Sequence, residues 1–471
     1  MLCPTTQVVK LTMQNEQVWP RQLRAKVYGG PFRAEDSLLA FALSVVETRR
    51  AWNCSRRRSR RFPRERAGEA LITASPRRVI SPPPRPRTAY NRVTTCATSA
   101  PYLMLKITKW IVVGLGLASS AVTLASLSRG SHWLVRSWDF PRVQIAAAAA
   151  VSATLFRGLF FRGRRSDWLL LLNNVFCVLW QTRKILPFTP FARVQVKRSA
   201  LKGSTGRSLR LLISNVMMEN REPERLLRLI AECQPDLVLT VETNAVWARA
   251  LQLLLENFPH TIQQPQENYF GMMLFSRFPL VQPAVKFLVQ EDIPSVHTVV
   301  VLPSGDRIFL HGLHPRPPEP IRDQDSTPRD AELVVVGRAI RENGDRPTIV
   351  AGDLNDVAWS PTTELFLRLS GLLDPRVGRG FYNSFHAENV LVRYPLDHVF
   401  HSNHFTLTEL RRLPRIGSDH FPVLIELCFD PKAKARQPKP QADADDLEDA
   451  NDKLQRQAKA AQTGDDRPKE G

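Results

Sequence analysis

Long apolar runs mark the chain between residues 104 and 190, at about 107–127, 143–161 and 168–186. The first has the roughly 20 apolar residues that a helix needs to cross bilayer hydrocarbon. The second is interrupted by Arg157, and tryptophans near the run ends resemble an aromatic belt. Buried helices of a soluble domain are the alternative, disfavoured because the runs lack a polar face. The pattern predicts a membrane anchor of two or three transmembrane helices over 104–190.

Between residues 208 and 428 short apolar runs alternate with amphipathic stretches. Residues 209–215 and 235–242 predict strands that end in polar side chains. Residues 224–233 predict a helix with leucines on its buried side, and 331–342 predict another. The mixed order of the elements favours an α/β sandwich over a regular parallel doubly wound sheet.

The two ends of the chain show neither pattern. Residues 1–103 are rich in Arg and Pro, a composition that buries too little apolar surface to fold, and we expect them to be disordered. A targeting peptide or a nucleic-acid-binding arm are two explanations; a start assigned too early is the favoured one, because coherent patterning begins at Met104. Residues 191–207 are interpreted as a linker, and 429–471 as a disordered charged tail.

The net charge of +20 is unevenly distributed along the chain. Residues 1–103 contain 19 Lys or Arg against 6 Asp or Glu, and residues 104–200 contain 14 against 2. The remaining residues contain 32 against 37 and are therefore weakly acidic. A domain that follows a phosphate backbone usually has its own basic face, so this distribution disfavours a dedicated nuclease.

Polar residues with catalytic potential recur where the predicted strands end. If the strand ends converge, these residues form one pocket of carboxylates, amides and imidazoles: Asn215, Glu242, His314, Asp353, Asn355, Asp397, Asp419 and His420. The six cysteines have no metal-binding spacing, and oxygen ligands without thiolates suit Mg²⁺ or Mn²⁺. Each signal is weak alone, because an isolated Asp-His pair or Gly-Asp-Leu-Asn segment is often a turn.

Taken in order, these motifs resemble the endonuclease/exonuclease/phosphatase superfamily, whose members share the deoxyribonuclease I-like fold. The resemblance rests on Asn215, Pro235-Asp-Leu-Val-Leu-x-x-Glu242, Gly271-Met-Met-Leu-Phe-Ser-Arg, His314, Gly352-Asp-Leu-Asn, Leu396-Asp-His and Gly417-Ser-Asp-His-Phe-Pro-Val. It implies a four-layer α/β/β/α sandwich over 208–428, in a membrane-anchored bacterial-type member. One departure is Thr240-Val241 before Glu242, where many relatives have an aromatic residue or Leu followed by Gln.

The resemblance also implies roles for single residues. Glu242, with Asn215 beside it and Asp419 nearby, matches the metal-binding positions. Asp353 matches the aspartate that orients or deprotonates the attacking water. The remaining matches are a phosphate-binding asparagine, the Asp–His pair and a leaving-group histidine, at Asn355, Asp397 with His420, and His314.

The predicted function is a membrane-anchored phosphoesterase that uses Mg²⁺ or Mn²⁺ for in-line attack of water on a phosphodiester or phosphomonoester. A lipid head group or another membrane-proximal phosphoester is the favoured substrate. A nuclease acting on DNA or RNA is the first alternative, and a non-catalytic membrane scaffold is the second. No obligate protein partner can be inferred from the sequence.

Two further expectations concern arginines. Arg316 and Arg322, on a Pro-rich segment after His314, are candidates for clamping a substrate phosphate, although an ordinary solvated loop is the simpler interpretation. The cluster Arg162, Arg164 and Arg165 predicts a cytoplasmic loop, which would place the domain on the periplasmic side of a multi-pass inner-membrane protein. Arg183 and Lys184 oppose that orientation.

Overall fold

The computed structural model describes residues 99–128, 130–200, 206–318 and 325–463 of the chain. The chain divides into two compact units, Met1–Lys106 and Ile107–Gly471. In the first unit only residues 99–106 are described, as the start of a helix, so the predicted Arg- and Pro-rich extension lies almost wholly outside the described residues. The second unit contains the predicted anchor and the α/β domain.

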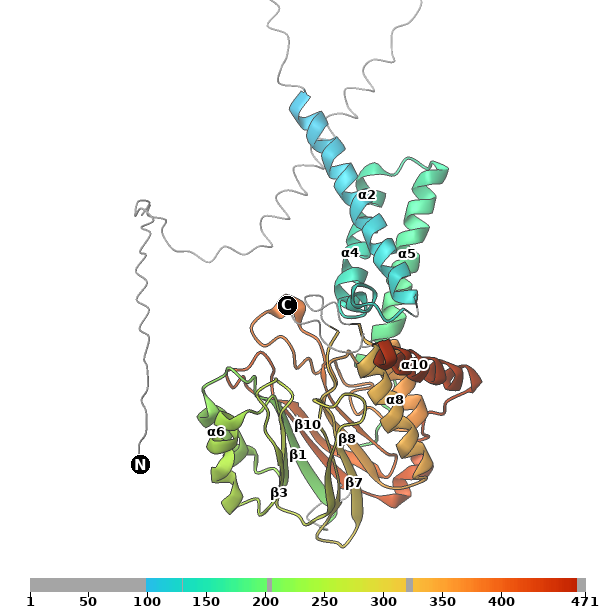
Figure 1. The fold of residues 1–471 in the computed structure, drawn as a ribbon. Coiled ribbons are helices and arrows are strands. Elements are labelled where there is room, and N and C mark those ends of the chain that lie inside the picture. The colour runs from blue at the N-terminus through green and yellow to red at the C-terminus, as the bar shows by residue number, and fades with distance from the viewer. Residues whose placement is uncertain (1–98, 129, 201–205, 319–324, 464–471) are drawn as a thin grey trace, which may run out of the picture. The chain divides into compact units, whose positions relative to one another are not determined.

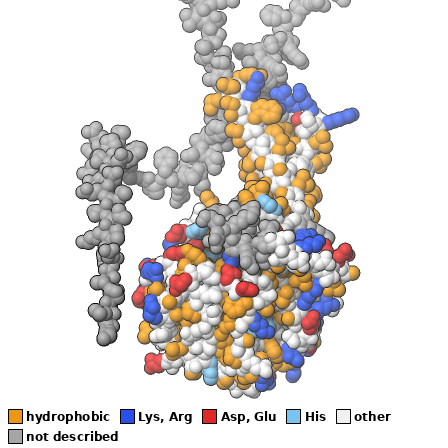
Figure 2. Space-filling view, viewed as in Figure 1, with side chains coloured by type: hydrophobic (Ala, Val, Ile, Leu, Met, Phe, Trp, Pro, Cys, Tyr) orange, Lys and Arg blue, Asp and Glu red, His pale blue; other side chains and the backbone are white. Residues whose placement is uncertain are grey.

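Helices form the segment that was predicted as an anchor (Figure 1). They are α2 (Ser99–Leu127), the short α3 (Trp133–Arg136), α4 (Arg142–Leu155) with a π-helical extension at Phe156–Phe160, and α5 (Arg165–Ile185). Hydrophobic side chains cover much of the helical segment (Figure 2). Those more than half exposed include Trp110, Ile111, Leu117, Leu124, Trp168, Leu169, Leu172 and Leu179. Contiguous apolar surface of this kind is typical of a membrane or protein contact.

Two helical stretches are long and apolar enough to cross a membrane, Tyr102–Leu127 and Arg142–Phe160. The third predicted crossing, now α5, is helical but is not among the candidates found in the described part of the chain. Length and composition make these two helices weak evidence for a membrane, so membrane insertion stays a prediction.

Polar residues on the inner face of α5 explain why this helix is less apolar than the two candidate membrane spans. Asn173 donates a hydrogen bond to Ser120 Oγ, and Gln181 Nε2 donates one to Thr123 Oγ1 at 3.0 Å. Polar side chains that bond to each other between helices lower the hydropathy of α5 without facing outward.

The domain that follows has two sheets. The first has the strand order β10-β11-β1-β2-β4-β3 and the second the order β5-β6-β7-β8-β9. The strands are β1 (Ser208–Asn215), β2 (Leu237–Val241), β3 (His260–Gln264), β4 (Met272–Ser276), β5 (Leu280–Lys286), β6 (Ser295–Val301), β7 (Arg307–Gly312), β8 (Thr348–Asp353), β9 (Asp397–His401), β10 (Phe405–Arg412) and β11 (Val423–Phe429). The helices are α6 (Pro223–Cys233), α7 (Ala245–Leu251), α8 (Thr327–Glu342), α9 (Pro361–Ser370) and α10 (Ala444–Thr463).

Alternating side chains of the strands produce four layers. Leu211 belongs to the core between the two sheets, while its neighbour Leu212 points to the other face and packs with Leu226 of α6. On the second sheet, Val350 packs against Leu333 of α8. The layers therefore run helices, sheet, sheet, helices, and the predicted α/β/β/α sandwich is confirmed (Figure 1).

The predicted linker over 191–207 is wrong for its described part. Val196 is fully buried in the core between the sheets. Ser199 N donates a hydrogen bond to the carbonyl of Leu407, and Leu407 N donates one to the carbonyl of Lys197. These residues therefore extend the edge of the first sheet beside β10, because an apolar side chain and free backbone groups are both satisfied there.

The predicted disordered tail over 429–471 is also wrong in part, since residues 444–463 form α10. Its Ala450 is buried against Leu365 and Leu369 of α9. Lys453 Nζ forms an ion pair with Asp330 at 2.8 Å, where both side chains are largely buried. The high content of charged residues suggested disorder, but the apolar positions spaced along one face of α10 are enough to dock it.

The Lys453–Asp330 pair provides a test of this docking. We expect Lys453→Met to lower the free energy of unfolding by roughly 3 kcal/mol, because Asp330 is left buried with fewer positive partners. The melting midpoint, followed by tryptophan fluorescence of the full chain, should drop by roughly 5–10 °C. Lys459→Met, an exposed lysine of the same helix, is the control and should change the midpoint little. Equal midpoints for the two variants would show that α10 does not dock as described.

Candidate active site

Polar side chains from both sheets meet at one edge of the sandwich. Asn215 ends β1, and Glu242 directly follows β2, which runs parallel to β1. In the second sheet Asp353, the last residue of β8, pairs with Asp397, the first residue of β9. His420 comes from the segment before β11 and reaches the same place. The convergence expected from the sequence is therefore present for these five residues.

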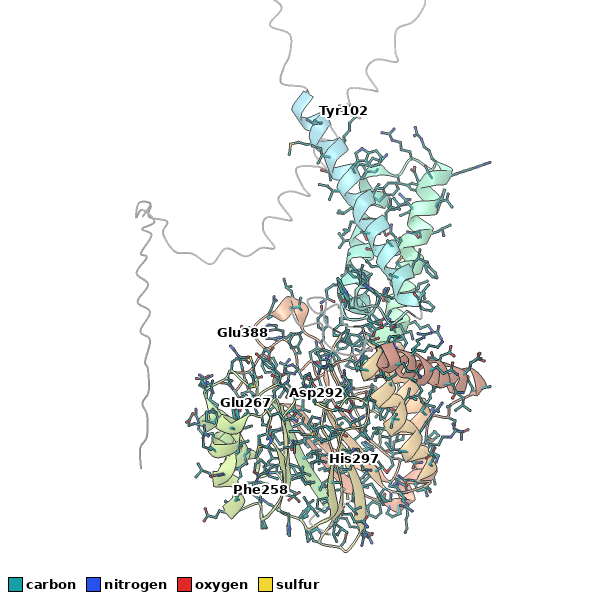
Figure 3. The ribbon with its side chains drawn as sticks, in the orientation of Figure 1. Tyr102, Phe258, Glu267, Asp292, His297 and Glu388 are labelled. Carbon is teal, nitrogen blue, oxygen red and sulfur yellow. The ribbon has the colours of Figure 1, made fainter. Side chains whose placement is uncertain are left out.

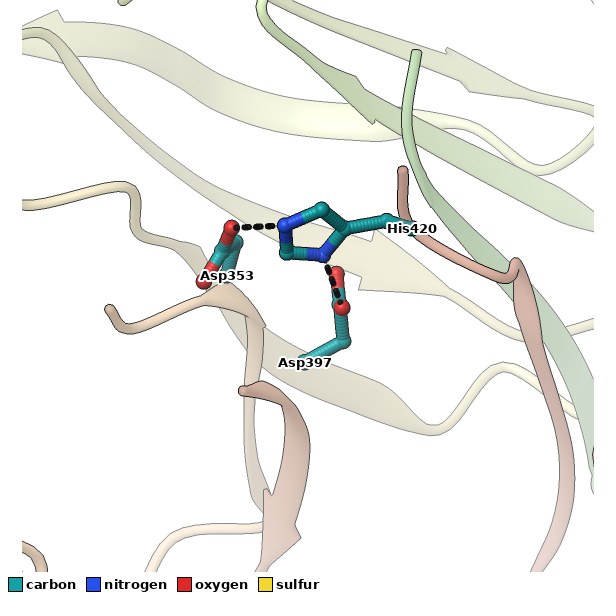
Figure 4. Close-up of side chains that lie close together, drawn as sticks. All are labelled: Asp353, Asp397 and His420. Atoms are coloured by element: carbon teal, nitrogen blue, oxygen red, sulfur yellow. Dashed lines mark hydrogen bonds and ion pairs between the residues drawn. The ribbon is translucent and has the colours of Figure 1, made fainter. Parts of the chain in front are cut away.

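An Asp–His–Asp chain lies at the centre of this edge (Figure 4). His420 Nδ1 donates to Asp397 Oδ2 at 2.7 Å, and His420 Nε2 lies 3.5 Å from Asp353 Oδ2. All three side chains are buried. Burial alone disfavours a charged imidazole, but the Asp397 and Asp353 carboxylates outweigh it and raise the pKa of His420 to about 10. His420 is therefore a buried imidazolium held between two carboxylates.

Asn215 links Glu242, a predicted metal ligand, to the Asp353–His420–Asp397 chain. Its Nδ2 donates to Glu242 Oε1 at 2.7 Å and to Asp353 Oδ2 at 3.1 Å. Burial raises the pKa of Glu242 to about 7, with the Asn215 hydrogen bond and His420 opposing the rise. Burial likewise raises the pKa of Asp353 to about 6, opposed by His420. The raised pKa values show that one imidazolium does not fully offset the cost of burying these two carboxylates.

Backbone conformation supports the placement of two of these residues. Glu242 has φ +59° and Asn355 has φ +50°, in the left-handed region that residues with a Cβ rarely adopt. Such strain persists where the surrounding structure fixes it and is common at functional sites. Asn355 N donates to Asp353 Oδ1 at 2.9 Å, so the turn that strains Asn355 also orients the aspartate.

The other predicted site residues lie around this centre. Asp419 is half-buried, and its charge contributes to the environment of Glu242. Asn355 Nδ2 donates to the carbonyl of Pro315 at 3.0 Å, which joins the Asp353 turn to the segment after His314. The catalytic, metal and phosphate-binding roles of all these residues stay predictions.

His314 and Arg316 are more enclosed than the sequence suggested. His314 is 2% exposed, packs against the Phe270 ring, and its Nδ1 has no hydrogen-bond partner among the described residues. Burial, with the nearby His420 charge, lowers the pKa of His314 to about 3, so it is neutral. Arg316 is 4% exposed, forms an ion pair with Asp292 and lies over the Phe270 ring.

Arg316 therefore does not stand on a solvated loop, because its guanidinium is already paired and stacked. It stabilises the segment after His314 instead of presenting a free charge to a ligand. Arg322, the second predicted clamp residue, lies outside the described residues.

Within the described residues, Asp353, Asp397 and His420 form a group whose potential ligand atoms lie within 4.8 Å of one another. We do not interpret that group as the metal position. Both nitrogens of His420 face carboxylates and the ring carries a proton, so it offers no lone pair to a cation. Glu242 and Asp353 also lie together, because both accept a hydrogen bond from Asn215 Nδ2.

Some residues that shape the site were missed by the sequence analysis. Ser384 is fully buried, and its Oγ accepts hydrogen bonds from the backbone N–H of Leu396 and of Asp397 at 3.2 and 3.0 Å. Arg329 Nη1 donates to the carbonyl of Asn355 at 2.9 Å. Neither residue belongs to a motif, and only the long-range fold brings them to the site, so no local signal could have identified them.

The strand pair that carries His314 and Asp353 depends on a glycine. Gly352 has φ +141°, and a Cβ built on it would lie 2.0 Å from the carbonyl oxygen of Leu313. Leu313 N donates to the carbonyl of Ala351 at 3.0 Å, so the two segments touch backbone to backbone. Glycine is required here because any side chain would separate them.

The sequence profile of the endonuclease/exonuclease/phosphatase family matches residues 212–420. No curated protein matches the chain significantly. Similar solved structures include an endonuclease/exonuclease/phosphatase from Beutenbergia cavernae (18% identity, 48% of this chain and 72% of that chain, TM-score 0.39). The human Nocturnin catalytic domain with bound sulfate is 18% identical, with 47% of this chain and 95% of that chain covered and a TM-score of 0.40. D. rerio TDP2 with a single-strand DNA product is 17% identical, with 47% of this chain and 98% of that chain covered and a TM-score of 0.40.

Fold, site and profile together define a hydrolase domain of the nuclease or phosphatase type. Residues 212–420 match the endonuclease/exonuclease/phosphatase family, and the family assignment applies to this domain.

The close approach at Gly352 leads to a prediction for folding. Gly352→Ala should lower the free energy of unfolding by about 2–4 kcal/mol, because the new Cβ meets a backbone oxygen that cannot move aside. Gly344→Ala is the matched control: its φ is also positive, but nothing lies within 4 Å of the added Cβ, so about 1 kcal/mol is expected. Thermal unfolding of the full chain measures both. A Gly352 variant as stable as the Gly344 variant would contradict the tight strand contact.

Proposed function

We propose that this protein is a membrane-anchored phosphoesterase that depends on a divalent cation and hydrolyses a phosphodiester or phosphomonoester by in-line attack of water. The observation that carries the proposal is the buried Asp353–His420–Asp397 chain directly beside the Asn215–Glu242 pair. The arrangement offers one fixed positive group and a set of oxygen donors at the same sheet edge.

The donor set fits a hard divalent cation. Glu242 and Asp353 share one amide donor, Asn215, and His420 is the positive side chain that contacts Asp353. Asp397 Oδ1 is buried without a hydrogen-bond partner among the described residues. Carboxylates collected in this way are favourable when a cation joins them, and oxygen ligands select Mg²⁺ or Mn²⁺. A bound ion would supply charge neutralisation on the phosphoryl oxygens.

The protein's own residues supply positioning and charge. The His420 imidazolium, fixed by Asp397, is placed to stabilise negative charge that develops on a phosphoryl oxygen. Asp353, oriented by the Asn355 N–H and by Asn215, is placed to accept a proton from the attacking water. His314 is neutral and enclosed by Phe270, so in this conformation the proton for a leaving group comes more readily from His420 than from His314.

The favoured substrate is a phosphoester at a membrane surface, such as a lipid head group. Exposed apolar helices precede the domain, and the residues from 201 onward carry no net positive charge. A nuclease remains the alternative that a substrate screen would reveal, and a scaffold without catalysis is the alternative of another class. An inner-membrane location with the domain on the periplasmic side is part of the proposal.

Metal binding and catalysis are tested together with conservative variants of the full chain in lipid nanodiscs. Adding Mg²⁺ or Mn²⁺ should raise the melting midpoint of the wild type, because the ion binds only the folded site. Glu242→Gln should abolish that rise without lowering the metal-free midpoint, because it removes a buried negative charge. It should also reduce hydrolysis of bis-p-nitrophenyl phosphate.

Asp353→Asn should reduce the same hydrolysis by roughly 10²–10⁴-fold, the usual contribution of a positioned general base. Glu256→Gln, an exposed acid, is the control for both measurements. If metal ions shift neither the midpoint nor the rate of the wild type, the proposed metal dependence is wrong. Turnover that survives Asp353→Asn would remove the role given to Asp353.

Ser384 is expected to act on the reaction as a positioning residue. Ser384→Ala leaves two backbone N–H groups unpaired next to Asp397 and should cost about 1–3 kcal/mol of stability. It should also lower kcat, since Asp397 orients His420. Ser402→Ala is the matched control: Ser402 Oγ accepts a hydrogen bond from Thr348 N at the other end of the same strand pair. A similar loss of stability with kcat reduced only in Ser384→Ala is the expected result; equal kcat values would make Ser384 purely structural.

A further inference from the structure

A loop at residues 386–393 connects the candidate active site with a strongly exposed apolar tip. At its base, Phe385 packs against the His420 ring with 5.0 Å between centroids, and Ala387 N donates to the carbonyl of Asp419 at 2.7 Å. At its tip, Val390 and Leu391 are 70% and 78% exposed. The base is therefore fixed to the catalytic segment, while the tip offers two hydrophobic side chains to its surroundings.

The tip is not a loosely held turn. Asn389 Oδ1 accepts a hydrogen bond from Leu391 N at 3.0 Å and caps the short helical turn Val390–Val392. Arg393 donates to the carbonyls of His386 and Ala387, which closes the loop across its neck. A structured loop that keeps adjacent aliphatic side chains exposed is unfavourable in water and typical of a contact surface.

The position of the loop tip along α4 indicates what the tip would contact. Gln144 Nε2 donates to the carbonyl of Leu391 at 2.6 Å. Gln144 is the third residue of α4, within Arg142–Phe160, one of the two stretches long and apolar enough to cross a membrane. At about 1.5 Å rise per residue, Gln144 lies roughly 3 Å inside the start of that stretch. The tip of the loop thus stands where a bilayer around α4 would change from head groups to hydrocarbon.

The charged side chains of the loop lie at its base, which is consistent with this position of the tip. Arg415 pairs with Glu388 at the side of the loop, and Arg393 lies behind the tip. An apolar tip above a polar and charged base is typical of segments that enter the membrane interface. Glu388 lies at the end of the domain that faces the helices, whereas Phe258 lies at the opposite end (Figure 3).

We infer that the loop 386–393 inserts Val390 and Leu391 into the lipid bilayer that surrounds α4, and that the candidate active site beside its base thereby receives phosphoester groups of lipids from the same membrane. The first half of this inference, the bilayer contact, rests on the proposed membrane anchor alone, and the second half rests also on the proposed phosphoesterase activity. The occupant of the apolar tip is lipid because the tip is bonded to the start of the candidate membrane helix.

The contact is tested by a fluorescent reporter without reference to catalysis. Leu391→Cys is labelled with an environment-sensitive nitrobenzoxadiazole dye in the full chain, with Cys3, Cys54 and Cys96 replaced by serine; the other three cysteines are buried. In nanodiscs of neutral and anionic phospholipid, we expect blue-shifted emission that spin-labelled lipids quench. Leu253→Cys, at a residue 72% exposed near Phe258, is the control and should report water. A label at position 391 that also reports water and escapes quenching overturns the inference.

The consequence for substrate is tested with Val390→Asp combined with Leu391→Asp, a surface change that leaves the site intact. Hydrolysis of the soluble diester should be unchanged, which also shows that the variant folds. Hydrolysis of nanodisc phospholipid should fall by roughly tenfold or more, because the variant lacks the two apolar side chains that would enter the bilayer. Equal loss on both substrates, or none on lipid, contradicts presentation by the loop. If the label enters the bilayer and the wild type hydrolyses nothing, the proposed function fails and the membrane contact stands.

Discussion

The charge balance around His420 governs the site, because water does not reach the buried Asp353 and Asp397 carboxylates to screen their charge. One imidazolium lies between Asp353 and Asp397, and Glu242 and Asp419 add further negative charge nearby. A single positive charge is stabilised by these neighbours, which is why it persists against burial. Burial still raises the pKa of Glu242 and of Asp353, and a divalent cation would supply the further positive charge that favours their ionised forms. The Asp353–His420–Asp397 chain and the carboxylate of Glu242 therefore belong to one electrostatic arrangement.

That arrangement requires accurate backbone placement, and the fold provides it from both sheets. The turn after β8 is held by Arg329, which is 1% exposed, donates to the carbonyl of Asn355 and pairs with Asp330. Ser384 holds the start of β9 through two backbone N–H groups. Buried polar groups that are fully bonded act as rigid supports, and here they keep Asp353 and Asp397 at the spacing that His420 bridges.

The sequence predicted the parts of this structure that depend on local pattern. Short apolar strands and amphipathic helices such as α6 favoured an α/β sandwich. The ordered strand-end motifs, through their resemblance to a known family, implied its four layers and site residues such as Asn215 and Asp353. What depends on tertiary contact was not predictable. Arg316 looked solvated because nothing in its neighbourhood in sequence shows that Phe270 and Asp292 enclose it. The charged residues around Ala450 suggested disorder because the α9 surface that buries it lies far away in the chain.

The helical segment is joined to the site more closely than a flexible tether would be. Trp359, six residues after Asp353, is 1% exposed, and its Nε1 donates to the carbonyl of Asp139 at 2.7 Å. Phe188, just beyond α5, packs on the same ring, and Leu396, next to Asp397, belongs to the same cluster. Lys184 near the end of α5 pairs with Glu364 of α9. Removing the helices would expose Trp359 and the back of the turn that carries Asp353. The helices therefore serve as a structural support of the site, and the two segments are expected to be stable and active as one unit.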